Sequence, residues 1–146
     1  MPESHRIICI NISRDLCLKL IERRAMSPDQ LSNSMRLLTT AAENLFLDIH
    51  EPAGIPVLRL ARDITVKLTE LGMVGSVQSA AVTLAENGRM VAEVAGQLDL
   101  TLAPSALKTA RDLTLKMLET GRLSRTSLPA LFEELAISVV EKAAQN

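Results

Sequence analysis

Apolar and charged residues recur in the same order at three places along the chain. The shared pattern reads Arg-Asp-apolar-x-apolar-Lys-apolar-x-Glu, and it covers residues 14–22, 62–70 and 111–119. Four charged positions match in all three copies, and successive copies begin 48 and 49 residues apart. We therefore interpret the pattern as an internal repeat.

Each copy is followed by turn residues and then by a second segment with helical apolar periodicity. Gly72 and Gly121 stand where a helix commonly ends in a left-handed residue. Arg24 holds that place in the first copy, where the left-handed conformation is costlier. Ser27 and Gln30 have the spacing of a capping box at a helix start. The repeating unit is therefore predicted to be a helix, a turn and a second helix.

Three such units predict an all-α chain that folds as a single domain over residues 1–146. The hairpins should cover about residues 8–49, 56–98 and 104–143 and pack into one helical bundle. The six predicted helices span residues 8–23, 28–49, 56–71, 76–98, 104–120 and 125–143. The fourth carries mostly small apolar residues, which let helices approach closely.

Two structural alternatives stay open at this point. The β-branched run of residues 7–12 could form a short strand instead of the start of the first helix. A period close to that of HEAT-type repeats would also suit an α-solenoid.

The first helix of each unit is predicted to be apolar on more than one side. At about 100° per residue, Asp15, Lys19 and Glu22 fall on one narrow polar stripe, on which Asp15 and Lys19 are spaced to pair at i,i+4. Apolar side chains cover most of the remaining circumference, so the helix needs cover on several sides. Because so short a chain leaves some of that surface uncovered, we expect a homo-oligomer or a protein partner.

The repeated arginines Arg14, Arg62 and Arg111 fall inside the apolar arc of that wheel. A guanidinium there must extend to solvent or pair with a carboxylate from a neighbouring helix or subunit. Contact with an anionic ligand or partner is the alternative.

The charge balance argues against a general polyanion binder. The chain has 16 Lys and Arg against 17 Asp and Glu, and its only aromatic residues are two Phe. Nucleic-acid surfaces usually combine a basic surplus with aromatic stacking. Basic residues do gather at two predicted turns, where they suit helix C-termini or, alternatively, could contact phosphates. These residues are Arg23, Arg24, Arg122 and Arg125.

The sequence contains none of the common catalytic and metal-binding motifs. The chain shows no paired nucleophile and base, no His-Glu-x-x-His and no phosphate-binding loop, so we expect neither an enzyme nor a cofactor or metal site. Cys9 and Cys17 would lie about 12 Å apart on one helix, beyond disulfide reach, and are predicted to be buried thiols. Without a secretory signal or membrane-span pattern, we expect a cytoplasmic protein away from membranes.

One stretch of the third unit resembles the N-terminal region of the MucR/Ros family of bacterial zinc-finger regulators. The likeness lies in a helix, a short polar turn and a Leu-Pro-x-Leu second helix, carried by Leu113-Thr114, Met117-Leu118, Thr120-Gly121-Arg122-Leu123 and Ser127-Leu128-Pro129-Ala130-Leu131. The first unit resembles it more loosely, over Met26-Ser27-Pro28-Asp29-Gln30-Leu31. In that family this region is associated with self-association, and a separate finger contacts DNA. That finger has no counterpart here, so the resemblance implies an oligomerisation or regulatory module.

Three functional hypotheses follow, in order of preference. The first is a non-enzymatic helical module for oligomerisation or protein interaction, in a bacterial regulatory context. The second is a DNA-binding regulator that contacts phosphates through its basic turns. The third is a helical carrier that holds an apolar ligand at the centre of the bundle.

Overall fold

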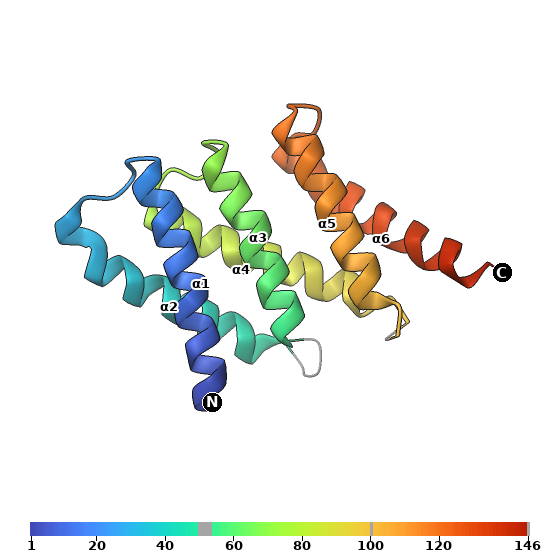
Figure 1. The fold of residues 1–146 in the computed structure, drawn as a ribbon, viewed down its shortest axis with the longest axis horizontal. Coiled ribbons are helices and arrows are strands. Elements are labelled where there is room, and N and C mark those ends of the chain that lie inside the picture. Colours follow the sequence, from blue (N-terminus) through green and yellow to red (C-terminus); the bar gives the residue numbers. More distant parts are fainter. Residues whose placement is uncertain (50–53, 100, 146) are drawn as a thin grey trace. The chain divides into compact units, whose positions relative to one another are not determined.

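The structure, a computed structural model, describes residues 1–49, 54–99 and 101–145 and is helical throughout its regular elements (Figure 1). The helices are α1 (Glu3–Glu22), α2 (Leu31–Asp48), α3 (Gly54–Glu70), α4 (Val77–Ala95), α5 (Ala103–Glu119) and α6 (Leu128–Ala144). Single 3₁₀ turns, η1 (Pro28–Gln30) and η2 (Arg125–Ser127), lead into α2 and α6. Within the described residues, the predicted all-α class with six helices is confirmed.

The first helix starts earlier than predicted, at Glu3, so residues 7–12 are helical and the strand alternative is wrong. The additional turn is held against α2, because the ring of His5 packs on Phe46 with 4.7 Å between ring centroids. The β-branched run is therefore kept in a helix by tertiary packing, which overrides its weak local preference for strand.

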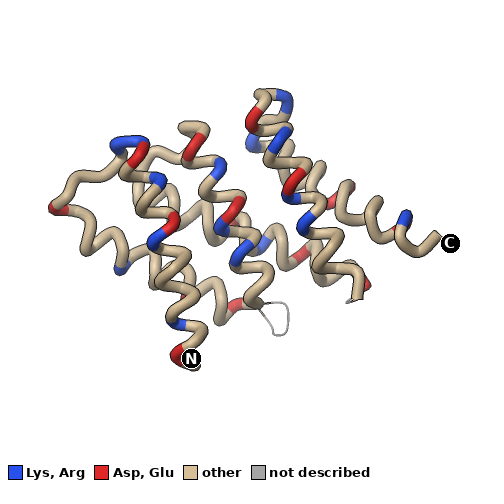
Figure 2. The backbone as a smooth tube through the Cα atoms, in the orientation of Figure 1, with Lys and Arg blue, Asp and Glu red and all other residues tan. Residues whose placement is uncertain are grey.

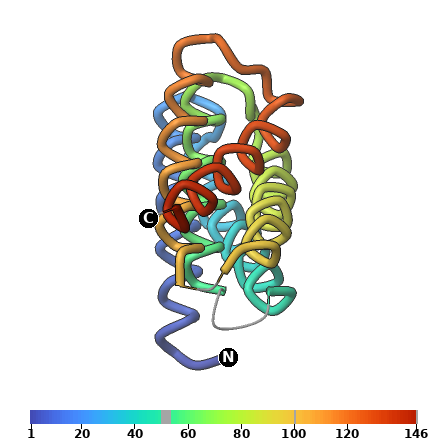
Figure 3. The backbone as a smooth tube through the Cα atoms, turned by 90° about the vertical axis from the view of Figure 1, so that its right-hand side faces the viewer, coloured from blue at the N-terminus to red at the C-terminus, as the bar shows by residue number. Residues whose placement is uncertain are grey.

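The chain divides into two compact units, Met1–Arg89 and Met90–Asn146, and the division falls inside α4. In the first unit α1 packs against both α2 and α3. Seen from the side, α1 and α3 form one layer, and α2 lies in a second (Figure 3). The core between these layers is aliphatic and includes Ile12, Leu16, Leu20, Leu38, Ala42, Leu58, Ala61, Ile64 and Leu68.

The first unit also contains a close helix approach at Gly88 of α4. A Cβ atom added there would lie 2.8 Å from Cγ of Leu45 on α2, closer than packed carbon atoms tolerate. Next to it, the side-chain amide of Asn87 donates a buried hydrogen bond to Oγ1 of Thr65 on α3, at 2.9 Å. Thr65 in turn donates to the carbonyl oxygen of Ala61 at 2.7 Å, so these buried polar groups are satisfied.

In the second unit α5 and α6 pack along each other as a helical hairpin. The buried side chains are mostly small, and Phe132 is the largest of them, with no exposed surface. The other buried residues of the two helices are Ala103, Ala106, Leu107, Ala110, Thr114, Leu118, Leu128 and Ala136, and the end of α4 adds Val91, Val94 and Ala95.

The first helix of each hairpin ends in the same left-handed turn. Positive φ angles occur at Gly72 (79°) and Gly121 (74°), as predicted, and at Arg24 (57°) in the first copy. In all three turns the residue after the left-handed one donates its N–H to a carbonyl five residues earlier, as Ala25 does to Leu20 at 2.9 Å. These are Schellman motifs, which satisfy the last carbonyls of each helix.

The left-handed arginine predicts a stabilising substitution. Arg24→Gly should raise the free energy of unfolding by about 1 kcal/mol. A residue with a side chain costs roughly 1–2 kcal/mol in the left-handed conformation, and glycine avoids this cost but loses more conformational entropy on folding. Gly121→Arg is the matched reverse change, since no atom lies within 4 Å of the position its Cβ would take. Gly121→Arg should lower the free energy of unfolding by a similar amount. Urea unfolding followed by circular dichroism measures both changes. Equal stabilities in all three proteins would contradict the strain.

Candidate protein-interaction surface

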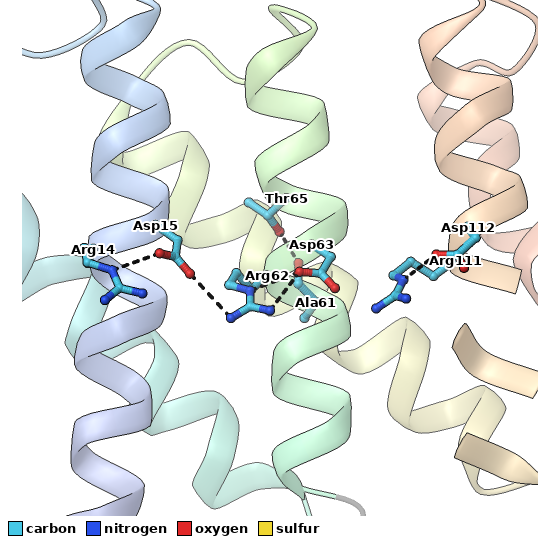
Figure 4. A network of polar contacts seen from close by, with 8 residues as sticks. All are labelled: Arg14, Asp15, Ala61, Arg62, Asp63, Thr65, Arg111 and Asp112. Atoms are coloured by element: carbon cyan, nitrogen blue, oxygen red, sulfur yellow. Dashed lines mark hydrogen bonds and ion pairs between the residues drawn. The ribbon is translucent and has the colours of Figure 1, made fainter. Parts of the chain in front are cut away.

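Two of the three repeated arginines form a chain of ion pairs in the first unit (Figure 4). The Nε of Arg14 donates to Oδ1 of Asp15 at 3.0 Å, and Nη1 of Arg62 on α3 reaches Oδ2 of the same Asp15 at 3.4 Å. Arg62 also donates to Oδ1 of its neighbour Asp63 at 3.0 Å. The Asp of one repeat is therefore contacted by the Arg of the next.

The third copy makes the same local contact in the second unit. There the Nε of Arg111 donates to Oδ1 of Asp112 at 3.0 Å (Figure 4). The adjacent Arg-Asp dipeptide thus forms a hydrogen-bonded pair in every copy of the repeat.

A second set of ion pairs uses the Lys and Glu of the repeat. Lys19 Nζ lies 2.8 Å from Glu22 and 4.0 Å from Glu70 on α3, and Lys67 lies 3.4 Å from the same Glu70. The hydrogen bond to Glu22 raises the pKa of Lys19 above its ordinary value. The lysines therefore pair with a glutamate three residues later, whereas the sequence suggested an aspartate four residues earlier. Partly exposed pairs of this kind contribute about 0–1 kcal/mol each, so they fix register more than they stabilise.

One side of α1 is apolar and exposed, and we call it the α1 outer face. Its large apolar side chains follow helical spacing around Arg14, whose side chain is 58% exposed. They are Ile7, Ile10, Leu18 and Ile21. The opposite side of α1 carries Leu16 and Leu20, which are fully buried, so this helix is apolar on two sides.

The corresponding side of α3 is covered rather than exposed. Leu58 and Thr69 lie on the same side of α3 as Arg62, which reaches α1, and both are fully buried. In the repeat register they match Ile10 and Ile21 of the α1 outer face. In the second repeat, the matching side of α3 is covered by the preceding repeat helix, α1. Among the described residues, the α1 outer face has no such cover from a preceding helix.

The last copy of the repeat has an exposed side of its own, which we call the α5 outer face. It comprises Asp112, Leu113 and Lys116, whose side chains are exposed. Their counterparts in the first copy lie against α3: Leu16 is fully buried and the Asp15 side chain is 27% exposed, against 67% for Asp112. Sequence comparison treated the copies as equivalent and missed this difference.

The basic turn residues belong to separate units. Arg23 and Arg24 are exposed at the end of α1, and the Arg23 guanidinium lies against Gly72 of the next turn. Arg122 is exposed in the second unit, where Arg125 is half-buried. Along α1 and α3 basic and acidic residues are interspersed (Figure 2), so neither sign of charge dominates these helices.

Both cysteines are free, buried thiols on α1. Burial, together with the nearby Glu43 carboxylate, raises the pKa of Cys9 to about 11. Burial also raises the pKa of Cys17, and a hydrogen bond with Ser13 opposes that shift. Among the described residues no group of His, Cys, Asp and Glu is arranged to hold a metal ion. No helix in this part of the chain has the length and apolar character to cross a membrane.

The raised thiol pKa values predict slow modification of the folded protein. At pH 8 both cysteines should react with a thiol reagent at least about a hundredfold more slowly than in the urea-unfolded chain, because only the accessible thiolate reacts. The unfolded Cys9 thiol loses its proton near its ordinary pKa of 9.0 and the folded one near 11. The stability held by the neutral thiol is therefore complete below pH 9 and lost between pH 9 and 11. Fast labelling of the native protein would contradict the burial.

No family model, curated protein or solved structure matches the chain.

Proposed function

We propose that this chain is a non-enzymatic helical module that associates with further copies of itself. The observation that carries the proposal is the α1 outer face. Four large apolar side chains at helical spacing are 43–54% exposed, although Leu58 and Thr69 at matching positions of α3 are fully buried. Covering such a face is favourable, since full burial of an exposed aliphatic side chain contributes about 1.5–3 kcal/mol and these side chains still expose about half of their surface.

The two apolar sides of the repeat unit support association with another helical surface. A repeat unit that is apolar on two sides is covered by its neighbours, and the terminal units leave a face open. The resemblance of the third hairpin to the MucR/Ros self-association region favours the same function and stays a prediction.

Light scattering over a wide range of protein concentrations tests this function. The wild-type mass should rise with concentration above that of one chain. Leu18→Glu should weaken association by at least about tenfold, because a carboxylate would have to be buried in the contact, while circular dichroism stays unchanged. Leu18 is 54% exposed on the α1 outer face.

Val82→Glu is the matched control, because Val82 is an equally exposed apolar residue (57%) on α4, outside that face. It should associate like the wild type. A wild-type protein that stays at the mass of one chain at every concentration would overturn the proposed function.

A further inference from the structure

The two outer faces are complementary in charge as well as exposed. The α1 outer face presents Arg14, with Glu22 beside it at 63% side-chain exposure. The α5 outer face presents Asp112 and Lys116. Each face thus offers one cation and one anion, in opposite order along its helix: the cation comes first on α1 and the anion comes first on α5.

The first unit shows how such faces fit together. Where α3 packs on α1, Arg62 reaches Asp15 at 3.4 Å and Glu70 lies 4.0 Å from Lys19. In the repeat register Arg14 and Glu22 match Arg62 and Glu70. On the other side of the contact, Asp112 and Lys116 match Asp15 and Lys19. The outer faces therefore carry the two halves of a contact already formed inside the chain.

From this match we infer that a second copy docks its α1 outer face on the α5 outer face of the first. The contact repeats the packing of α3 on α1 between two chains, with Arg14 on Asp112 and Glu22 on Lys116. Leu113, half exposed in the single chain, is covered as Leu16 is in the first unit. The inference rests on the proposed function and specifies which surfaces meet.

The arrangement is head-to-tail, because the two faces in contact are different. A copy bound through its α1 outer face still has a free α5 outer face, so further copies add in series. A two-fold dimer through α1 alone would use one face twice and stop at two copies.

Charge reversal at the two ends of the chain distinguishes these arrangements. In the proposed contact, Arg14→Asp places a carboxylate opposite the carboxylate of Asp112, and Asp112→Arg places a guanidinium opposite that of Arg14. Because like charges repel, each variant alone should associate about tenfold more weakly than the wild type. An equimolar mixture of the two variants should recover the wild-type mass. When the variants alternate along the series, residue 14 of each chain lies opposite a residue 112 of opposite charge. The double variant in one chain should recover it too. Arg59→Asp, at an exposed position of the middle hairpin, makes the same change in net charge as Arg14→Asp and should leave association unchanged.

The possible outcomes separate the inference from the proposed function. If Asp112→Arg associates like the wild type while Arg14→Asp does not, α1 meets another surface and the inference is wrong, although self-association stands. If neither reversal changes the mass of an associating protein, or if the mixture recovers nothing, the inference is also wrong. A monomeric wild type would overturn the proposed function itself. Circular dichroism checks folding, and recovery in the mixture cannot come from an unfolded variant.

Discussion

Phe132→Ala should lower the free energy of unfolding of the second unit by about 3–5 kcal/mol. Phe132 is fully buried on α6, and half of the other buried residues of α5 and α6 are alanines. Small neighbours cannot move in to fill the space of a phenyl ring, so the substitution removes apolar burial and leaves a cavity as well. The second unit contains few other large buried side chains to compensate.

Urea unfolding followed by far-ultraviolet circular dichroism measures this loss, since the chain has no Trp or Tyr to serve as a fluorescent probe. Amide hydrogen exchange shows where it falls, and α5 and α6 should lose the most protection. Glu134→Ala, at an exposed position on the same helix, should change stability by no more than about 0.5 kcal/mol. A Phe132→Ala variant as stable as this control would show that the ring is not part of the core.

The features that could be predicted from sequence are those set by local patterns. Helical periodicity and the three copies of the repeat predicted the helices, because both depend on residues within one or two turns of each other. The left-handed turns at Gly72 and Gly121 follow from local backbone sterics in the same way, and their positive φ angles confirm the prediction. The start of α1 could not be predicted, because it depends on the packing of His5 against Phe46, far along the chain.

The candidate surfaces were only partly visible in the sequence. The wheel placed Arg14 and Arg62 in an apolar arc, and the structure shows Arg62 contacting a carboxylate on the neighbouring helix. Whether a repeat position is buried depends on having a neighbour on that side, which identical sequence patterns do not encode. The exposure of the α1 and α5 outer faces could therefore not be predicted from the repeat pattern alone. The buried pair of Asn87 and Thr65 was missed for a related reason, since its partners lie on different helices.

Leu16 and Leu113 hold the same position in the repeat, yet their truncation should have very different costs. Leu16→Ala should lower the free energy of unfolding by about 2–5 kcal/mol, because the side chain is fully buried in the first unit and its removal leaves a cavity. Leu113 is 48% exposed on the α5 outer face, so Leu113→Ala should cost the single chain less than about 1 kcal/mol.

Both variants are best measured by urea unfolding at a protein concentration low enough to keep the chain monomeric. At high concentration the difference should narrow, because a docked second copy would bury Leu113 and make its truncation costly through lost association. Leu16→Ala should show little such dependence, since Leu16 is already covered within its own chain. Equal costs for the two substitutions in the monomer would mean that the last repeat is covered like the first, and the α5 outer face would then not be open to a partner.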